Sequence, residues 1–386
     1  MTTITALHHP RRHAAAGARS RALLERLLAP ADVRLDGRRP WDIRIHDARM
    51  PMRVLTHGSL GAGESYMEGW WDCEQLDDMF ARALRVQIDS QLGSMHEVGA
   101  TLLARLRNAQ SRRRAFQIGE RHYDAGDDLY QRMLDPRMIY SCGYWRDAPD
   151  LETAQQHKLD LVFRKLGLKP GMRVLDIGCG WGGAARYAAE QYGVTVTGIT
   201  VSHNQLETAR QHCRDLPVDI QLVDYRALTG SFDRIYSLGM FEHVGVRNYR
   251  HFFTKVRELL KPDGLFLLHT IGGNRSTNRT DPWIEKYIFP NSMLPSIAQI
   301  ASAAEHDWVI EDWHSFGPDY DRTLMAWLTN FDGNWAQIAP QYGERLRRMW
   351  RYYLSSSAAS FRARSNQLWQ VLMSPNGIAG GVREIR

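Results

Sequence analysis

From residue 174 onward, short apolar segments alternate with segments of helical periodicity, and this alternation restricts the fold more than any other feature of the sequence. Strands are predicted at residues 174–177, 194–200, 220–224, 232–238 and 264–271. Strand–helix–strand units of this length place successive strands parallel to one another. We therefore expect an α/β protein with a doubly wound, Rossmann-like parallel sheet.

The rest of the chain is interpreted from its length and from its glycine and apolar patterns. A length of 386 residues is too great for one ordinary core, so a smaller N-terminal α+β domain is expected. In this domain, residues 1–20 are predicted to be a frayed arm and residues 33–56 to form short strands joined by turns. A glycine-rich loop is expected from residue 58, and a later helix is expected to reach residues 112–114. The tail at 335–373 is predicted to be helical.

The positive charge of the chain is concentrated near its beginning. The net charge is +6, and residues 1–114 account for +5 of it. Such a bias indicates contact with a polyanion, which could be nucleic acid or an anionic membrane surface. No apolar run is long enough to cross a bilayer, and the start lacks the apolar core of a secretory leader. The four cysteines have no zinc spacing, so we expect free thiols in a reducing compartment and no metal site.

A glycine-rich turn directly follows the first strand of the predicted sheet. The run GCGWGG at residues 178–183 fits G-x-G-x-x-G, which also occurs in nicotinamide-binding folds. Two details argue against a nicotinamide cofactor: Asp176 lies inside the strand, and the second strand ends at 200–202 without the acidic residue expected for the ribose. The form Asp-x-Gly-x-Gly-x-Gly is typical of S-adenosylmethionine (SAM) methyltransferases.

Five motifs together resemble the cyclopropane-fatty-acyl-phospholipid synthases. They are YSCGYW (140–145), VLDIGCGWGG (174–183), ITVSHNQ (199–205), MFEHVG (240–245) and FRARSNQLWQ (361–370). The resemblance is specific over residues 115–386 and looser before them. It implies a SAM-dependent catalytic domain at 116–386 and a homodimer. The segment near 282–315 interrupts the strand–helix alternation and is expected to be a helical insertion. Beside such a catalytic domain, the positive charge of residues 1–115 favours a basic domain that contacts lipid.

The resemblance implies that SAM is the cofactor and assigns most of the residues that hold it. With Asp176 from the strand pattern, the expected cofactor-binding residues are Tyr140, Ser141, Asp176, Gly178, Gly180, Thr200, Val201, Gln205, Asp224 and Tyr225. The last two are expected near the adenine.

An alkene is a weak nucleophile, so the workable reaction is attack of its π bond on the SAM methyl group, followed by proton loss from a carbocation. Such a site must exclude water and supply one base. The resemblance implies that the base is a bound bicarbonate. Its expected cradle is Cys142, Glu242, His269, Tyr320 and the main-chain carbonyl of Ile271. Taken singly, each of these residues also has an ordinary structural interpretation.

Many members of this family carry a cysteine where this chain has Ser357, so a covalent thiol mechanism is not expected here. The expected partner is unsaturated phospholipid in a membrane, with the protein cytoplasmic and peripherally bound to the inner face. Nucleic acid is not expected, because the chain lacks a base-flipping motif and a recognisable RNA module. Two alternatives remain open: an enzyme that methyl-branches or hydroxylates another lipid, and a lipid-binding protein without catalysis.

Overall fold

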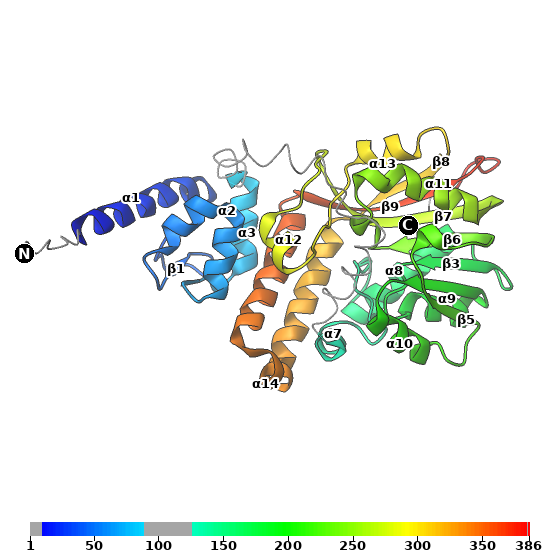
Figure 1. Cartoon of the computed structure of the whole chain (residues 1–386), viewed down its shortest axis with the longest axis horizontal. Coiled ribbons are helices and arrows are strands. Elements are labelled where there is room, and N and C mark those ends of the chain that lie inside the picture. The colour runs from blue at the N-terminus through cyan, green and yellow to red at the C-terminus, as the bar shows by residue number, and fades with distance from the viewer. Residues whose placement is uncertain (1–9, 89–125, 384) are drawn as a thin grey trace, which may run out of the picture.

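The computed structural model describes residues 10–88, 126–383 and 385–386. Figure 1 shows an N-terminal group of helices at one end, the main sheet at the other, and the long helix α14 between them. The N-terminal group comprises α1 (Pro10–Leu28), η1 (Ala29–Ala31), α2 (Met50–Met67) and α3 (Leu76–Arg85), with the two-residue strands β1 (Arg44–Ile45) and β2 (Trp71–Asp72). The predicted boundary near residue 115 and the helix reaching 112–114 lie outside the described residues.

The main sheet has seven strands in the order β5-β4-β3-β6-β7-β9-β8. The first five of these are parallel, whereas β9 runs antiparallel to both β7 and β8. The strands are β3 (Arg173–Ile177), β4 (Thr195–Thr200), β5 (Val218–Leu222), β6 (Phe232–Leu238), β7 (Leu260–Gly273), β8 (Val309–Ser315) and β9 (Asn366–Ser374). The predicted Rossmann-like α/β sheet is confirmed.

Helices cover both faces of the sheet, as the apolar strands require. Val174 of β3 packs in one cluster with α8 (Leu151–Lys165) and α9 (Gly183–Tyr192). Its neighbour Leu175 points the other way and packs with α11 (Tyr249–Leu259) and α13 (Ile297–Ala304). The remaining helical elements are α7 (Asp127–Met133), α10 (His203–His212), η2 (Tyr225–Ala227), η3 (Phe241–His243), η4 (Val246–Asn248) and α12 (Pro282–Tyr287).

Helix α14 (Pro318–Arg362) folds back on itself instead of running straight. Pro340 removes a backbone donor, and Gly343 has φ +70°, so the helix breaks into two arms there. An ion pair between Arg362 and Asp321, 2.9 Å long, joins the two arms at their far end. The arms pack against α2, α3 and α7, and a single apolar core extends from Leu24 to Leu368.

The helical prediction for residues 335–373 is wrong at its end, because Asn366–Ser374 forms strand β9 between β7 and β8. A strand covered on both faces is apolar on both faces, so it lacks the alternation that distinguishes a strand from a helix. The segment 282–315 contains the expected helices α12 and α13, but its last residues form strand β8.

The N-terminal region differs from the prediction in three places. Residues 10–20 belong to α1 and are not a frayed arm, and residues 50–56 are helical and not strand. The glycine-rich run also lies within α2 and is not a loop. A Cβ at Gly63 would overlap the ring of Trp283, so this glycine permits close packing of α2 on α12. Within the described ranges, no helix has the length and apolar character needed to cross a membrane.

Candidate functional site

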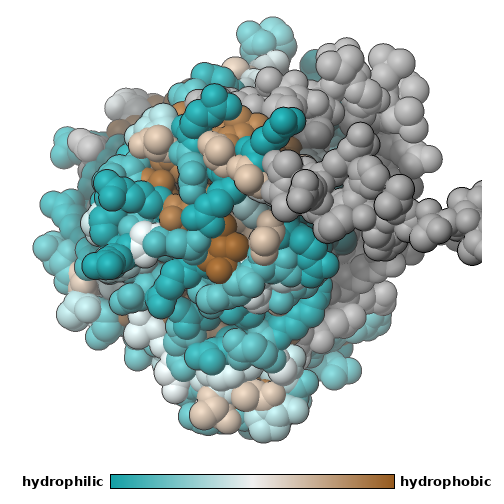
Figure 2. Space-filling model, turned by 90° about the vertical axis from the view of Figure 1, so that its left-hand side faces the viewer, coloured by the Kyte–Doolittle hydropathy of each residue, from teal (hydrophilic) through white to brown (hydrophobic). Residues whose placement is uncertain are grey.

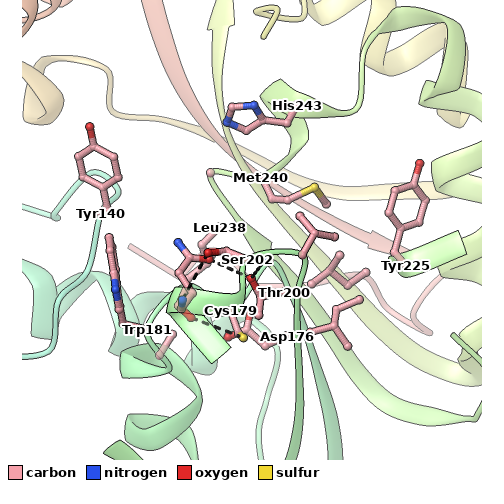
Figure 3. A pocket seen from close by; sticks show the side chains of 18 of the residues that line it. Tyr140, Asp176, Cys179, Trp181, Thr200, Ser202, Tyr225, Leu238, Met240 and His243 are labelled. Atoms are coloured by element: carbon pink, nitrogen blue, oxygen red, sulfur yellow. Dashed lines mark hydrogen bonds between the residues drawn. The ribbon is translucent and has the colours of Figure 1, made fainter. Parts of the chain in front are cut away.

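A pocket opens at the point in the sheet where the strand order changes side: the chain runs from β3 to β4 and β5 in one direction, and β6 and β7 lie on the other side of β3. Strand β3 pairs with β4 on one side and β6 on the other, and ligands of such folds bind at the carboxyl ends of these strands. All ten residues expected to bind the cofactor line this first pocket. Figure 3 shows Tyr140 and Trp181 on one side of it and Tyr225 on the other.

Glycine is required at the turn that follows β3. Gly178 has φ +87°, and a Cβ there would lie 2.7 Å from the Met240 side chain. The amides of Gly178 and Cys179 both donate to the carbonyl of Ile199, 3.0 Å away. The loop is thereby held against β4, with its main chain exposed to the pocket.

Asp176 is a buried carboxylate at the base of the first pocket. It is 1% exposed, and its Oδ2 has no hydrogen-bond partner among the described residues. Burial raises the pKa of Asp176 to about 7, and the neighbouring Tyr236 hydroxyl and the positive charge of Lys158 offset only part of that rise. An unpaired buried acceptor of this kind fits a ligand that brings a hydrogen-bond donor.

Lys158 is a residue that the sequence interpretation missed. It is fully buried on α8, and its Nζ donates to Ser141 Oγ over 2.9 Å. Gln155, one turn earlier, donates to the main-chain carbonyl of Ser141 over 2.8 Å. Burial lowers the pKa of Lys158 to about 8. A lysine on the apolar face of the 151–165 helix was the signal that could have revealed it.

Two hydrogen-bonded pairs of side chains, Thr200 with Gln205 and Asp224 with Arg226, lie at other sides of the first pocket. Thr200 Oγ1 donates to Gln205 Oε1 over 2.9 Å, so β4 and the start of α10 are joined at the pocket. Both carboxylate oxygens of Asp224 accept hydrogen bonds from the Arg226 guanidinium, at 2.7 and 2.6 Å. Asp224 is therefore an engaged carboxylate, unlike Asp176.

A second pocket adjoins the first, and Tyr140, Gly239 and His243 line both. Glu242, Ile271, Tyr320 and Ser357 also line the second pocket. Much of its remaining wall is apolar and comprises Ile284, Phe289, Leu294, Leu324 and Phe361. The two pockets together can hold a polar cofactor beside an apolar substrate.

Glu242 and His269 each leave one polar atom unpaired near this junction. Glu242 Oε1 accepts from the amide of Ile271 over 2.7 Å, but Oε2 has no partner among the described residues. His269 Nδ1 lies 3.4 Å from Gln370 Nε2, and its buried Nε2 likewise lacks a partner in the described part of the chain. Burial raises the pKa of Glu242 to about 7 and lowers the pKa of His269 well below its usual value. These unpaired atoms fit a small group that both donates and accepts hydrogen bonds, as bicarbonate does.

Cys142 and His269 line neither pocket, although both were expected at the reactive end. Cys142 is fully buried, and its Sγ donates to the carbonyl of Gly143 over 3.1 Å. Burial raises the pKa of the Cys142 thiol well above its usual value. The thiol is therefore not poised as a nucleophile.

His243 is a second residue that the sequence interpretation left without a role. It lines both pockets, and its buried Nδ1 has no partner among the residues described. Burial lowers the pKa of His243 to about 4, so the ring is neutral at neutral pH. Its position next to Glu242 in the motif at 240–245 was the sequence signal that could have placed His243 at the site.

Similarity to known proteins agrees with this geometry. The sequence model of the family described as mycolic acid cyclopropane synthetase matches residues 110–371. The cyclopropane-fatty-acyl-phospholipid synthase of Escherichia coli (strain K12) is 53% identical over 363 residues, which cover 93% of this chain and 94% of that protein. Sphingolipid C9-methyltransferase A of Emericella nidulans is 38% identical over 66% of this chain and 53% of its own length. The solved structure of mycolic acid cyclopropane synthase CmaA1, complexed with SAH and CTAB, is 36% identical with a TM-score of 0.62, covering 67% of this chain and 97% of that one.

Proposed function

This chain belongs to the mycolic acid cyclopropane synthetase family, and we propose that it transfers a methylene group from SAM to the cis double bond of unsaturated acyl chains in phospholipids. One observation carries the proposal: a pocket built for a polar cofactor adjoins an apolar pocket that contains Glu242 with an unpaired oxygen. The name of the Escherichia coli relative supports phospholipid as the substrate class.

When bound, SAM supplies an electrophilic methyl group and bicarbonate supplies a base. The residues lining the first pocket would hold SAM, and Glu242, His269, Tyr320 and the Ile271 carbonyl would hold bicarbonate. Cys142 was also expected in this cradle, but it lines neither pocket and its Sγ donates to the carbonyl of Gly143. Asp176 would accept from the amino-bearing end of SAM, because its Oδ2 is buried and unpaired.

The chain's own contribution to the reaction is to hold the double bond dry and to stabilise positive charge. The apolar wall of the second pocket excludes water, which would otherwise trap a carbocation on the lipid. Tyr140 lies where the pockets meet, and its hydroxyl is 2.9 Å from that of Tyr353. An aromatic face at this position can stabilise a cation by about 0.5–2 kcal/mol. Glu242 Oε2 would accept a hydrogen bond from the hydroxyl group of the bicarbonate.

The N-terminal helices would bring the enzyme to its substrate at an anionic membrane surface. Arg49 and Arg53 lie over the ring of Trp70, and Arg39 and Arg82 over that of Trp41. Each of these arginines also pairs with a neighbouring carboxylate, so its net charge toward a membrane is reduced. Mixed basic and aromatic groups suit a membrane interface. Figure 2 shows a mostly hydrophilic surface on this side, with a hydrophobic area near its centre. We infer a cytoplasmic, peripherally bound enzyme, and a homodimer on the strength of the family resemblance.

The test is incubation of the protein with methyl-labelled SAM and vesicles of unsaturated phospholipid, followed by mass analysis of the acyl chains. The expected product gains CH2 and loses its double bond. Label in nucleic acid, or no transfer to lipid, would contradict the proposal.

Relatives such as the sphingolipid C9-methyltransferase favour a second candidate, methyl-branching of another lipid. Because the fate of the carbocation depends on where the base lies, both candidates use the same pockets. A methyl-branched product in the same assay, or label only in sphingolipid, would favour the second candidate.

A further inference from the structure

An arginine on the loop between β7 and α12 faces the second pocket. Arg279 lines this pocket together with Thr277, Thr280 and Asp281. Thr277 and Asp281 are exposed, so they mark an end of the pocket that opens to solvent. The other end is the junction with the first pocket at Tyr140.

Side-chain hydrogen bonds fix the loop that carries Arg279. Thr280 Oγ1 donates to the carbonyl of Ser292 over 2.5 Å, and Gln299 Nε2 donates to the carbonyl of Thr277 over 2.9 Å. Within the loop, the amide of Arg279 donates to Thr277 Oγ1 over 3.2 Å. The arginine is therefore held at the pocket by its backbone.

One nitrogen of the Arg279 guanidinium lacks a hydrogen-bond partner among the described residues. Its Nη2 is buried without a hydrogen-bond partner, and Arg279 forms no ion pair within the described ranges 10–88, 126–383 and 385–386. By contrast, the part-buried Arg362 pairs with both Asp77 and Asp321. The nearby Asp281 uses its Oδ1 to cap α12 by accepting from the amides of Trp283 and Ile284.

We propose that Arg279 binds the phosphate oxyanion of the substrate lipid's headgroup while the acyl chain occupies the apolar wall beyond it. A guanidinium offers paired donors that match phosphate oxygens. An unpaired buried donor at the mouth of an apolar pocket is the arrangement that a phosphate with an attached acyl chain would satisfy. This inference rests on the proposed function and names the part of the substrate that the second pocket recognises.

The test compares Arg279→Gln with Arg275→Gln, which replaces an exposed arginine four residues earlier in the same loop. Each protein is assayed with dioleoylphosphatidylglycerol and with dioleoylglycerol in nonionic detergent micelles. We expect Arg279→Gln to lower kcat/KM for the phospholipid by about tenfold or more. Its kcat/KM for dioleoylglycerol and its KM for SAM should match those of wild type, and Arg275→Gln should match wild type throughout. An Arg279→Gln protein that loses equally on both lipids, or that keeps the wild-type preference, overturns the inference.

Two further arms separate the remaining outcomes. If Arg279 bound free phosphate instead of a headgroup, inorganic phosphate would inhibit dioleoylglycerol turnover in wild type but not in Arg279→Gln, and the lipid preference would be unchanged.

Binding of dihexanoylphosphatidylglycerol without SAM tests the site apart from catalysis. About tenfold weaker binding by Arg279→Gln supports the inference, and equal binding overturns it. Wild-type protein that binds this lipid but converts neither substrate would count against the proposed function alone. Arg279→Lys keeps the charge and should retain part of the binding if the glutamine variant does not fold.

Discussion

Buried charged side chains account for most of the chemistry at the scale of single residues. Asp176, Glu242 and Lys158 are all removed from water, and each lacks a full ion-pair partner. Groups of this kind are destabilising unless a ligand or neighbour compensates them, and they concentrate at functional sites. Two predictions at this scale follow from their pKa values and contacts.

The first concerns the pH dependence of stability. The pKa of Glu242 and that of Asp176 are both raised to about 7 by burial. A carboxyl whose pKa is higher in the folded state stabilises the fold below its unfolded pKa, and this contribution is lost as the pH rises through the folded pKa. The free energy of unfolding should therefore fall from about pH 5 to about pH 8, by up to about 3 kcal/mol per group.

Urea denaturation of wild type and Glu242→Gln at both pH values measures this effect. The glutamine variant should lose its share of the decrease, because the amide does not ionise. Glu305→Gln, at an exposed glutamate, should retain the full decrease. A Glu242→Gln protein with the wild-type dependence would show that Glu242 titrates normally.

The second prediction concerns Lys158, which acts on the first pocket through Ser141 and is a positioning residue. Lys158→Met should raise the dissociation constant of SAM by about tenfold, because Ser141 loses its buried partner. Lys165→Met is the matched control, since Lys165 is also buried on α8 but pairs with Asp312 at 2.8 Å. The control should reduce stability without changing SAM affinity, as calorimetric titration can measure. Equal losses of affinity in both variants would assign Lys158 a purely structural role.

At the scale of elements, close packing explains where the sequence patterns were misread. The glycine run in α2 predicts a loop from its sequence, but in the structure it lies within the helix and lets α2 approach Trp283 of α12. The apolar residues at 366–374 were predicted to be helical, but they form strand β9 between β7 and β8. In both cases, the deciding contact comes from a segment distant in the sequence.

Gly63→Ala tests the packing of α2 on α12. The added methyl group would overlap the Trp283 ring, so the free energy of unfolding should fall by about 1–3 kcal/mol. Gly333→Ala in α14 is the control, because a Cβ there meets no atom within 4 Å, and it should be neutral or stabilising by up to about 1 kcal/mol. Thermal or urea unfolding measures both, and equal effects would mean that the contact at Gly63 relaxes without strain.

At the scale of the whole molecule, a single apolar core joins the N-terminal helices to α14, and α14 in turn lines the second pocket. The helices proposed to contact the membrane and the second pocket are therefore joined through one packed core. Several N-terminal arginines are already neutralised by ion pairs, among them Arg39 with Asp32 and Asp42, and Arg53 with Glu64 and Glu68. The charge available to a membrane is therefore smaller than the number of arginines indicates.

Vesicle sedimentation tests the proposed membrane contact. Binding to vesicles with anionic lipid should exceed binding to neutral vesicles, and it should weaken as NaCl rises from about 50 mM to about 500 mM, because salt screens exposed charges. Binding that is equal on both vesicles and insensitive to salt would contradict an electrostatic contact.

The sequence by itself determined the parallel sheet, the glycine turn after its first strand and the membership of the family. These features depend on local periodicity, on backbone conformations that only glycine adopts readily, and on short motifs in a fixed order. It also identified ten of the residues that line the first pocket, nine through the resemblance that those motifs carry and Asp176 through the strand pattern.

Only the tertiary structure decided which charged groups are buried and which of them lack partners. The sequence offered only a weak signal for Lys158 beneath Ser141 and for His243 at the junction of the pockets, and it did not single out Arg279 at the mouth of the second pocket. Burial and pairing depend on segments far apart along the chain, as when α14 and the 274–281 loop close on the same cavity. No local pattern records those contacts, and for this reason the charges that distinguish the site became visible only in the folded protein.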